Sequence, residues 1–364
     1  MTSTRGAAIV YRLYDVGFEI DLNRAAELLT AARDAGEPLR VRPVRGEAQA
    51  IQIANPPITV ALGAESVPVP GAAGPAEVST RIFDFGVVSL RITIPAAEMT
   101  WAEFTAFGNA VDVGFDLTPI FDRQLASLLA CIGPAVERQE VKKVTEDYVV
   151  FRITSRLSPE TWRDENIVPL LLNERRALSD TARSELLPHR FSYYTDDLTI
   201  LTWDNALIVE PSADDADVQY ILEFANAQLL ELRVYDAILD AELPRMYDRV
   251  AVARPRGAGL LRGRYARLLS YMQALVADST ELVERVESAL KVTDDVYLAR
   301  IYTAALEIFR GREWRAAIDR KLSIIRETYD MLNGESQAAR SEALELLIVV
   351  LIMLEIVLAI LLRH

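Results

Sequence analysis

The spacing of hydrophobic and polar residues divides the chain into three parts with different expected structures. Over residues 1–211, short apolar runs alternate with polar and proline-containing segments, which is typical of mixed strands and helices. Over 212–334, apolar residues recur at steps of three and four, as in amphipathic helices. The end, 335–364, becomes almost uniformly apolar. The pattern predicts an α+β protein: a mixed α/β head (1–211), an antiparallel helical hairpin or coiled-coil stalk (212–334) and one C-terminal transmembrane helix (335–364).

The head shows both the strand and the helix period. Asp21 can cap an amphipathic helix that runs to about residue 33, and Thr100 can cap another. The run RIFDFGVVSLRITI, residues 81–94, predicts a hairpin or one long bulged strand. Other expected strands are 7–14, 39–44, 50–53, 58–62, 147–154, 191–194, 199–203 and 206–209, and other expected helices are 119–132 and 159–173.

The expected stalk consists of helices separated by short turns. Its helices are predicted over about 212–240, 261–290, 294–309 and 314–332, and Asn333 with Gly334 predicts a break before the last helix. In the helix over 314–332 the apolar residues step by four, four, three, four and three, close to a coiled-coil seam. The residues that this spacing assigns to an oligomer interface are Ile318, Leu322, Ile325 and Tyr329.

The last apolar run reads LLIVVLIMLEIVLAILL, Leu346 to Leu362. As a helix it would be roughly 25 Å long, close to the thickness of a bilayer core. The transfer of its Leu, Ile and Val side chains outweighs the cost of about 3 kcal/mol for one central carboxyl. The run therefore predicts a single-pass C-terminal anchor in the inner membrane, with membrane lipid as a partner and the bulk of the chain in the cytoplasm. The alternative is a helix buried in a large protein core.

Glu355 lies inside that apolar run. Acids within a membrane face other helices rather than lipid, so Glu355 predicts self-association, on a face shared with Ile348, Ile352 and Ala359. A pore or proton path is the sharper alternative.

Composition excludes several classes of function. The formal net charge of −14 disfavours direct binding of nucleic acid, unless the arginines between Arg245 and Arg267 are exposed together: Arg249, Arg254, Arg256, Arg262 and Arg264. One cysteine, Cys131, excludes an internal disulfide, and two histidines exclude a His-rich metal site. No phosphate-binding, dinucleotide-binding or zinc-protease motif is present. We therefore expect no cofactor and no metal, and favour a non-enzymatic function.

One polar cluster offers weak catalytic candidates. His189 and Arg190 are followed by tyrosines and then by Asp204, and short adjacent strands could bring these residues to one sheet edge. A histidine, an arginine and a carboxylate can bind an anion or act as acid and base, so a hydrolase or small-ligand enzyme using 189–204 is the alternative function. The plainer interpretation is that the aspartates of this segment form turns.

Three stretches resemble the required-for-meiotic-nuclear-division family of membrane-anchored proteins, bacterial branch. They are RIFDFGVVSLRITI (81–94), HRFSYYTDDLTILTWDNALIVEP (189–211) continuing to residue 240, and the C-terminal helices with their apolar tail (287–362). Eukaryotic relatives look like homo-oligomeric inner-membrane proteins that support mitochondrial translation, and bacterial relatives add no activity. The resemblance therefore implies a homo-oligomeric membrane protein with an unidentified, ribosome-associated protein partner. It implies no catalytic residues. The combined expectation is a tail-anchored, homo-oligomeric scaffold or adaptor.

Overall fold

The structure is a computed structural model that describes residues 3–34, 55–157, 161, 163–174, 176–211, 216–253, 269–274, 276–277, 293 and 295–361. Two expected strands, 39–44 and 50–53, and most of the helix expected over 261–290 lie outside the described residues. The chain divides into two compact units. Met1–Val234 with Ala289–Arg312 form the first, and Tyr235–Ser288 with Glu313–His364 form the second. The first unit thus continues past residue 211, and the division at residues 211 and 334 stays a prediction.

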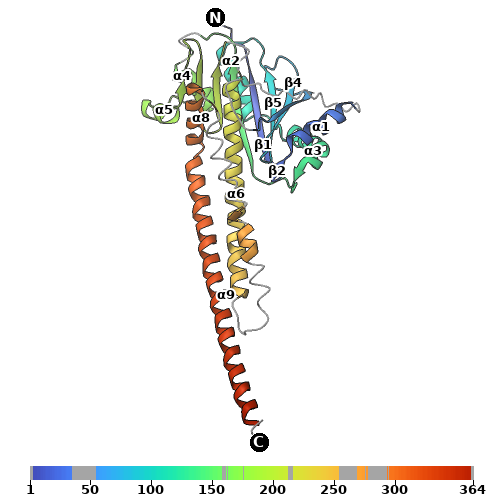
Figure 1. Cartoon of the computed structure of the whole chain (residues 1–364). Coiled ribbons are helices and arrows are strands. Elements are labelled where there is room, and N and C mark those ends of the chain that lie inside the picture. Colours follow the sequence, from blue (N-terminus) through green and yellow to red (C-terminus); the bar gives the residue numbers. More distant parts are fainter. Residues whose placement is uncertain are drawn as a thin grey trace. The chain divides into compact units, whose positions relative to one another are not determined.

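The first unit is built on an eight-stranded sheet ordered β3-β4-β5-β1-β7-β10-β9-β8 (Figure 1). Neighbouring strands are antiparallel, except that β10 runs parallel to β7. The strands are β1 (Gly6–Asp15), β3 (Ile58–Glu65), β4 (Ala76–Ile82), β5 (Val87–Pro95), β7 (Thr145–Ile153), β8 (Arg190–Phe191), β9 (Leu198–Leu201) and β10 (Asn205–Val209). A separate small sheet pairs β2 (Glu19–Ile20) with β6 (Val136–Glu137). The head is therefore a mixture of strands and helices, as expected.

One face of the sheet packs against four helices. These are α1 (Leu22–Asp34), α2 (Trp101–Asp112), α3 (Thr118–Ile132) and α4 (Asp164–Leu171). The same part of the chain also contains a 3-10 turn, η1 (Gly133–Ala135), and a short helix, α5 (Asp180–Leu186). Alternate residues of the central strands, such as Ala8 and Val10 in β1, enter this core with Phe104 and Phe121 from the helices. Thr100 caps α2 as expected, in a capping box with Glu103.

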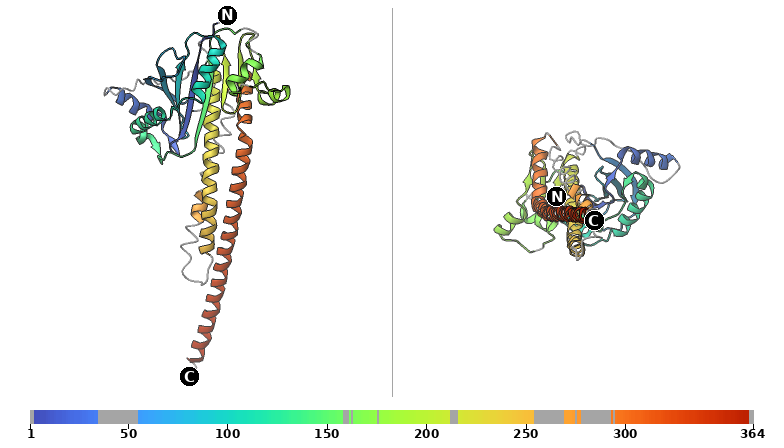
Figure 2. Two further views of the ribbon diagram at one scale, coloured as in Figure 1. Left: turned by 180° about the vertical axis from the view of Figure 1, so that it is seen from behind. Right: turned by 60° about the horizontal axis from the view of Figure 1, so that its bottom comes forward.

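The opposite face packs against the first part of α6 (Asp217–Ala253) and against α8 (Val296–Ile308), so the sheet lies between two helical layers (Figures 1 and 2). Aromatic rings pack between the sheet and this second layer. The ring centres of Phe83 and Phe224 of α6 are 6.0 Å apart, and those of Tyr148 and Phe309, which follows α8, are 5.7 Å apart. Every residue of α6 from Tyr220 to Leu232 is buried. The beginning of α6 is therefore an interior helix of the first unit.

The segment 81–94 forms a hairpin of β4 and β5 rather than one bulged strand. The turn contains Gly86 with φ +91°, a conformation that side chains rarely adopt. A Cβ atom at Gly86 would also lie 1.9 Å from the carbonyl oxygen of Gly17. Both features require glycine at the point where this turn meets the loop after β1.

The second unit contains the rest of α6 and most of α9 (Gly311–Leu361). Lys321 of α9 donates a 2.6 Å hydrogen bond to the carboxylate of Asp236 and pairs at 2.6 Å with Asp240, both on α6. Ile318, Leu322 and Ile325 are buried within the single chain, and Tyr329 accepts a hydrogen bond from Gln273. The seam thus packs inside one chain, and its role between copies stays a prediction.

Helix α9 continues without a break through Asn333 and Gly334, contrary to the expected break. A glycine in a helix costs only about 1 kcal/mol, and a Cβ at Gly334 would meet nothing, so neither residue forces a turn. The helix expected to begin near residue 335 is the end of α9.

Among the described residues, no helix is long and apolar enough to cross a membrane. This finding overturns the transmembrane helix predicted for 335–364, and with it the expected tail anchor and location in the inner membrane. Glu345 and Glu355 interrupt the apolar sequence of this part of α9, and a carboxyl inside a bilayer core costs about 3 kcal/mol.

Candidate functional site

The predicted polar cluster lies at the β8 edge of the sheet. His189 is half-buried, and its carbonyl accepts a 3.1 Å hydrogen bond from the N–H of Leu201. Arg190 is exposed in β8, opposite Ile200. Asp204 is exposed in the turn between β9 and β10. The strands bring the three segments to one edge, and a catalytic role of these side chains stays a prediction.

The neighbouring aspartates have structural contacts. Both carboxylate oxygens of Asp197 accept a hydrogen bond from the N–H of Tyr193, at 2.9 and 3.1 Å, and one accepts a further bond from Tyr194. Asp196 pairs with Arg156 at 3.3 Å on the surface. Asp197 therefore holds the turn between β8 and β9, as the plainer interpretation of this segment expected.

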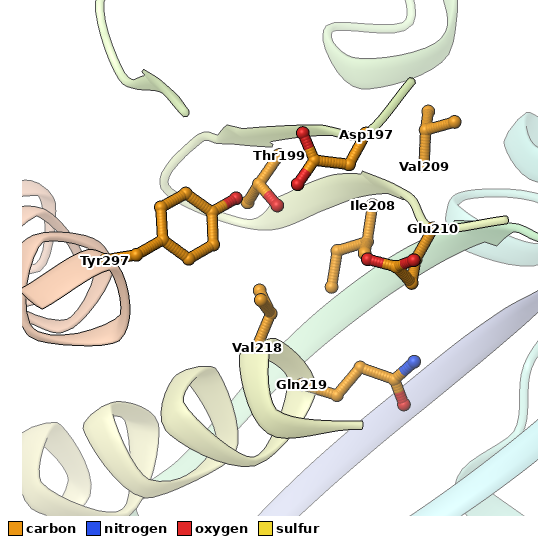
Figure 3. Close-up of a pocket in the computed structure, with 8 residues that line it drawn as sticks. All are labelled: Asp197, Thr199, Ile208, Val209, Glu210, Val218, Gln219 and Tyr297. Atoms are coloured by element: carbon orange, nitrogen blue, oxygen red, sulfur yellow. The ribbon is translucent and has the colours of Figure 1, made fainter. Parts of the chain in front are cut away.

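A small cavity lies beside this turn, between β9, β10 and the first turns of α6 and α8 (Figure 3). Its volume is about 10 Å³, and five of the eight lining residues are polar: Asp197, Thr199, Glu210, Gln219 and Tyr297. His189, Arg190 and Asp204 do not line it. Sites for small molecules enclose about 300–1,000 Å³, so this cavity cannot enclose a substrate.

The second layer of the sheet contains a buried ion pair that sequence reasoning missed. Arg81 of β4 pairs with Glu223 of α6, and the two side chains are 5% and 2% exposed. Arg81 also donates a 3.2 Å bond to Thr59, and its guanidinium lies 4.3 Å from the ring centre of Tyr220. The available signal was an acid flanked directly by apolar residues, Tyr220 to Leu222 before it and Phe224 with Ala225 after it. Because both charges are paired, the contact fixes α6 against the sheet.

Two further buried carboxyls have perturbed pKa values. Burial raises the pKa of Glu146 to about 6, although Arg233 of α6 opposes the shift. Burial raises the pKa of Asp15, at the end of β1, to about 7, although Lys142 opposes it. Neither lines the cavity, and no group of three or more His, Cys, Asp or Glu in the described residues could hold a metal ion. The raised pKa values make the contribution of these two groups to stability depend on pH.

The end of α9 carries the most extensive exposed apolar surface that the structure describes. Eleven large hydrophobic side chains between Leu344 and Leu358 are 48–63% exposed: Leu344, Leu347, Ile348, Val349, Val350, Leu351, Ile352, Met353, Leu354, Ile356 and Leu358. Exposed apolar surface of this extent marks an interaction site. Glu355 is exposed within it, and the side chain of Ala359 lies outside the described residues. We call residues 344–361 the leucine segment.

Leucines follow a strict heptad along this segment. Leu344, Leu347, Leu351, Leu354, Leu358 and Leu361 are separated by three, four, three, four and three residues. This is the a/d spacing of a coiled coil, and it places Glu355 at the adjoining e position. The heptad gives a candidate surface for contact between helices.

The fold defines a class of protein in which helices cover both faces of a mixed β-sheet, and α6 and α8 form one of the two helical layers. Within that class, the chain belongs to the family of the N-terminal domain of the uncharacterized protein MJ0711, whose family model matches residues 5–216. The uncharacterized protein MJ0711 of Methanocaldococcus jannaschii is 27% identical over 246 residues, which are 66% of this chain and 71% of that protein. No solved structure matches the chain.

This family membership corrects the resemblance to the required-for-meiotic-nuclear-division family, which was wrong. The resemblance rested on three stretches: 81–94, 189–240, and the C-terminal helices with their apolar tail over 287–362. The first stretch forms a turn that needs Gly86 and a buried strand, and the last contains a leucine heptad; such features recur in many unrelated proteins.

Proposed function

We propose that this protein is a self-associating scaffold whose copies join through the leucine segment and together carry several heads. The observation that supports the proposal is the exposed leucine heptad at the end of α9. A heptad suits a second copy because each chain offers the same complementary knobs and holes. An unidentified protein partner of the head stays a prediction.

Magnitudes favour more than two helices. Full burial of a leucine gives about 1.5–3 kcal/mol. The five described heptad leucines are about half exposed, so a pair of helices would gain roughly 8–15 kcal/mol. Association itself costs about 4–15 kcal/mol. A pair would also leave Val349, Met353 and Ile356 in water, so a bundle of three or more helices satisfies the segment better.

The mass of the full-length protein in solution tests the proposal. We expect sedimentation equilibrium to show an oligomer of fixed number that dissociates on dilution. Leu354→Glu places a charge in the heptad and should give monomers. The matched control is Met331→Glu, which changes an exposed side chain of α9 outside the segment (45% exposed) and should leave the oligomer intact.

A wild-type protein that stays monomeric at all concentrations would overturn the proposal. Monomers that bind to lipid vesicles in place of each other would overturn it too. Equal loss of the oligomer in both variants would show that charge anywhere on α9, rather than the heptad, controls association.

A further inference from the structure

The cavity of Figure 3 joins four elements of the first unit. Thr199 comes from β9, Glu210 directly follows β10, and Gln219 and Tyr297 lie in the first turns of α6 and α8. Two of its side chains are almost completely buried: Thr199 is 2% exposed and Gln219 is 4% exposed. The polar groups of the cavity therefore depend on partners inside the protein.

Gln219 lacks such a partner. Its side-chain nitrogen is buried and has no hydrogen-bond partner among the described residues. In Figure 3 this nitrogen lies on the side of the amide that faces Glu210. A buried amide N–H without an acceptor costs about as much as a lost hydrogen bond, so the position calls for an acceptor in the cavity.

The lining restricts what that acceptor can be. A volume of about 10 Å³ admits one small molecule and excludes organic ligands. The carboxylates of Asp197 and Glu210 repel an anion, and the inward amide N–H is unfavourable for a cation. A dry cavity is expected only where the walls are apolar, and five of these eight residues are polar. After these exclusions, the ligand must be a small neutral molecule that accepts a hydrogen bond from the amide N–H and donates one to a carboxylate.

We propose that the cavity holds one ordered water molecule, which accepts from the side-chain N–H of Gln219 and donates to Glu210. The water links the first turn of α6 to the end of β10, beside the turn that Asp197 holds. This site is independent of the self-association proposed for α9. It gives the side-chain nitrogen of Gln219, near the start of α6, a hydrogen-bond partner that none of the described residues supplies.

A crystal structure of the full chain near 1.5 Å resolution tests the site. We expect a single density peak at hydrogen-bond distance, about 2.7–3.2 Å, from the Gln219 nitrogen. Gln219→Leu removes the donor and replaces it with an apolar side chain, so the peak should disappear. Gln228→Leu is the matched control: Gln228 is equally buried on α6 but accepts directly from Tyr302, and the peak should persist in that variant.

Three results would overturn the proposal. The first is a wild-type structure with ordered side chains here and no peak. The second is a peak with ligand distances of about 2.3–2.6 Å, which would identify a cation instead. The third is a peak that survives Gln219→Leu. If the variants do not fold, the wild-type density alone decides between water, cation and a dry cavity.

Discussion

The beginning of α6 and the end of α9 are helical segments with opposite relations to water. From Tyr220 to Leu232, α6 is buried on every side although it contains Glu223, Asn226, Gln228 and Glu231. The leucine segment of α9 is half exposed although nearly all its residues are apolar. The polarity of a helix therefore does not by itself determine whether the helix lies in the core or at the surface. Paired polar groups can sit in a core, and an apolar helix exposed in a single chain indicates contacts beyond it.

The largest test of this contrast is truncation at two places. A chain that ends at Ala216, near the end of the family match, loses α6 and α8 and exposes one face of the sheet, including Tyr11, Phe83 and Tyr148. We expect no cooperative unfolding transition. A chain that ends at Ala343 lacks only the leucine segment and should unfold within about 1 kcal/mol of the full-length protein, because that segment is exposed.

Circular dichroism during thermal unfolding distinguishes the two truncated proteins. A cooperative transition in the chain that ends at residue 216 would show that the sheet does not need α6.

The next effect concerns the buried ion pair. Glu223→Ala leaves the guanidinium of Arg81 without its carboxylate in the core and should lower the free energy of unfolding by about 3–5 kcal/mol. Denaturant titration measures the change. The control is Glu27→Ala, which breaks the exposed pair with Arg24 and should cost less than about 1 kcal/mol. Equal effects of the two substitutions would contradict the role assigned to Glu223.

A smaller effect is the pH dependence that Glu146 contributes where it meets Arg233 of α6. Its pKa is about 6 in the folded protein against 4.5 ordinarily, so the folded state holds the proton more tightly. Its stabilisation is therefore fully present below about pH 4.5 and is lost as the pH rises through about 6, by about 2 kcal/mol in all. Glu146→Gln should flatten the stability curve in this window. An unchanged slope would contradict the assignment.

The smallest expected effect concerns the leucine segment of α9. Glu355 is an exposed acid beside the heptad, so Glu355→Leu should strengthen self-association by up to about 1 kcal/mol per chain and leave unfolding nearly unchanged. Sedimentation equilibrium measures the association. Unchanged association would place residue 355 outside the interface, and weaker association would contradict the expected cost of its charge there.

Local patterns predicted much of the head. Strand 7–14 and helix 119–132 agree with β1 and α3 within about one residue, because alternation and helical spacing report which side chains face a core. The Thr100 cap was also visible, since it depends only on residues three positions apart. Strand 191–194 shrank to Arg190–Phe191 because Asp197 draws Tyr193 and Tyr194 into a turn.

Long-range partners were beyond sequence reasoning. The carboxylate of Glu223 and the guanidinium of Arg81 are separated by 142 positions, and nothing local indicates that they meet. The cavity at Gln219 likewise depends on four elements from distant segments. The anchor prediction was also wrong: over 346–362 the apolar side chains outweigh the cost of one carboxyl, yet no described helix is long and apolar enough to cross a membrane.

The discontinuity of the first unit has a consequence for synthesis of the protein. Residues 1–234 and 289–312 belong to one compact unit, so the ribosome must make 78 further residues after 234 before that unit can be complete. At about 5–20 residues per second this takes roughly 4–16 s. During that time the surfaces of the nascent head that Ile301 and Phe309 later cover remain open. This interval is when the newly made chain is most exposed to aggregation and to chaperones.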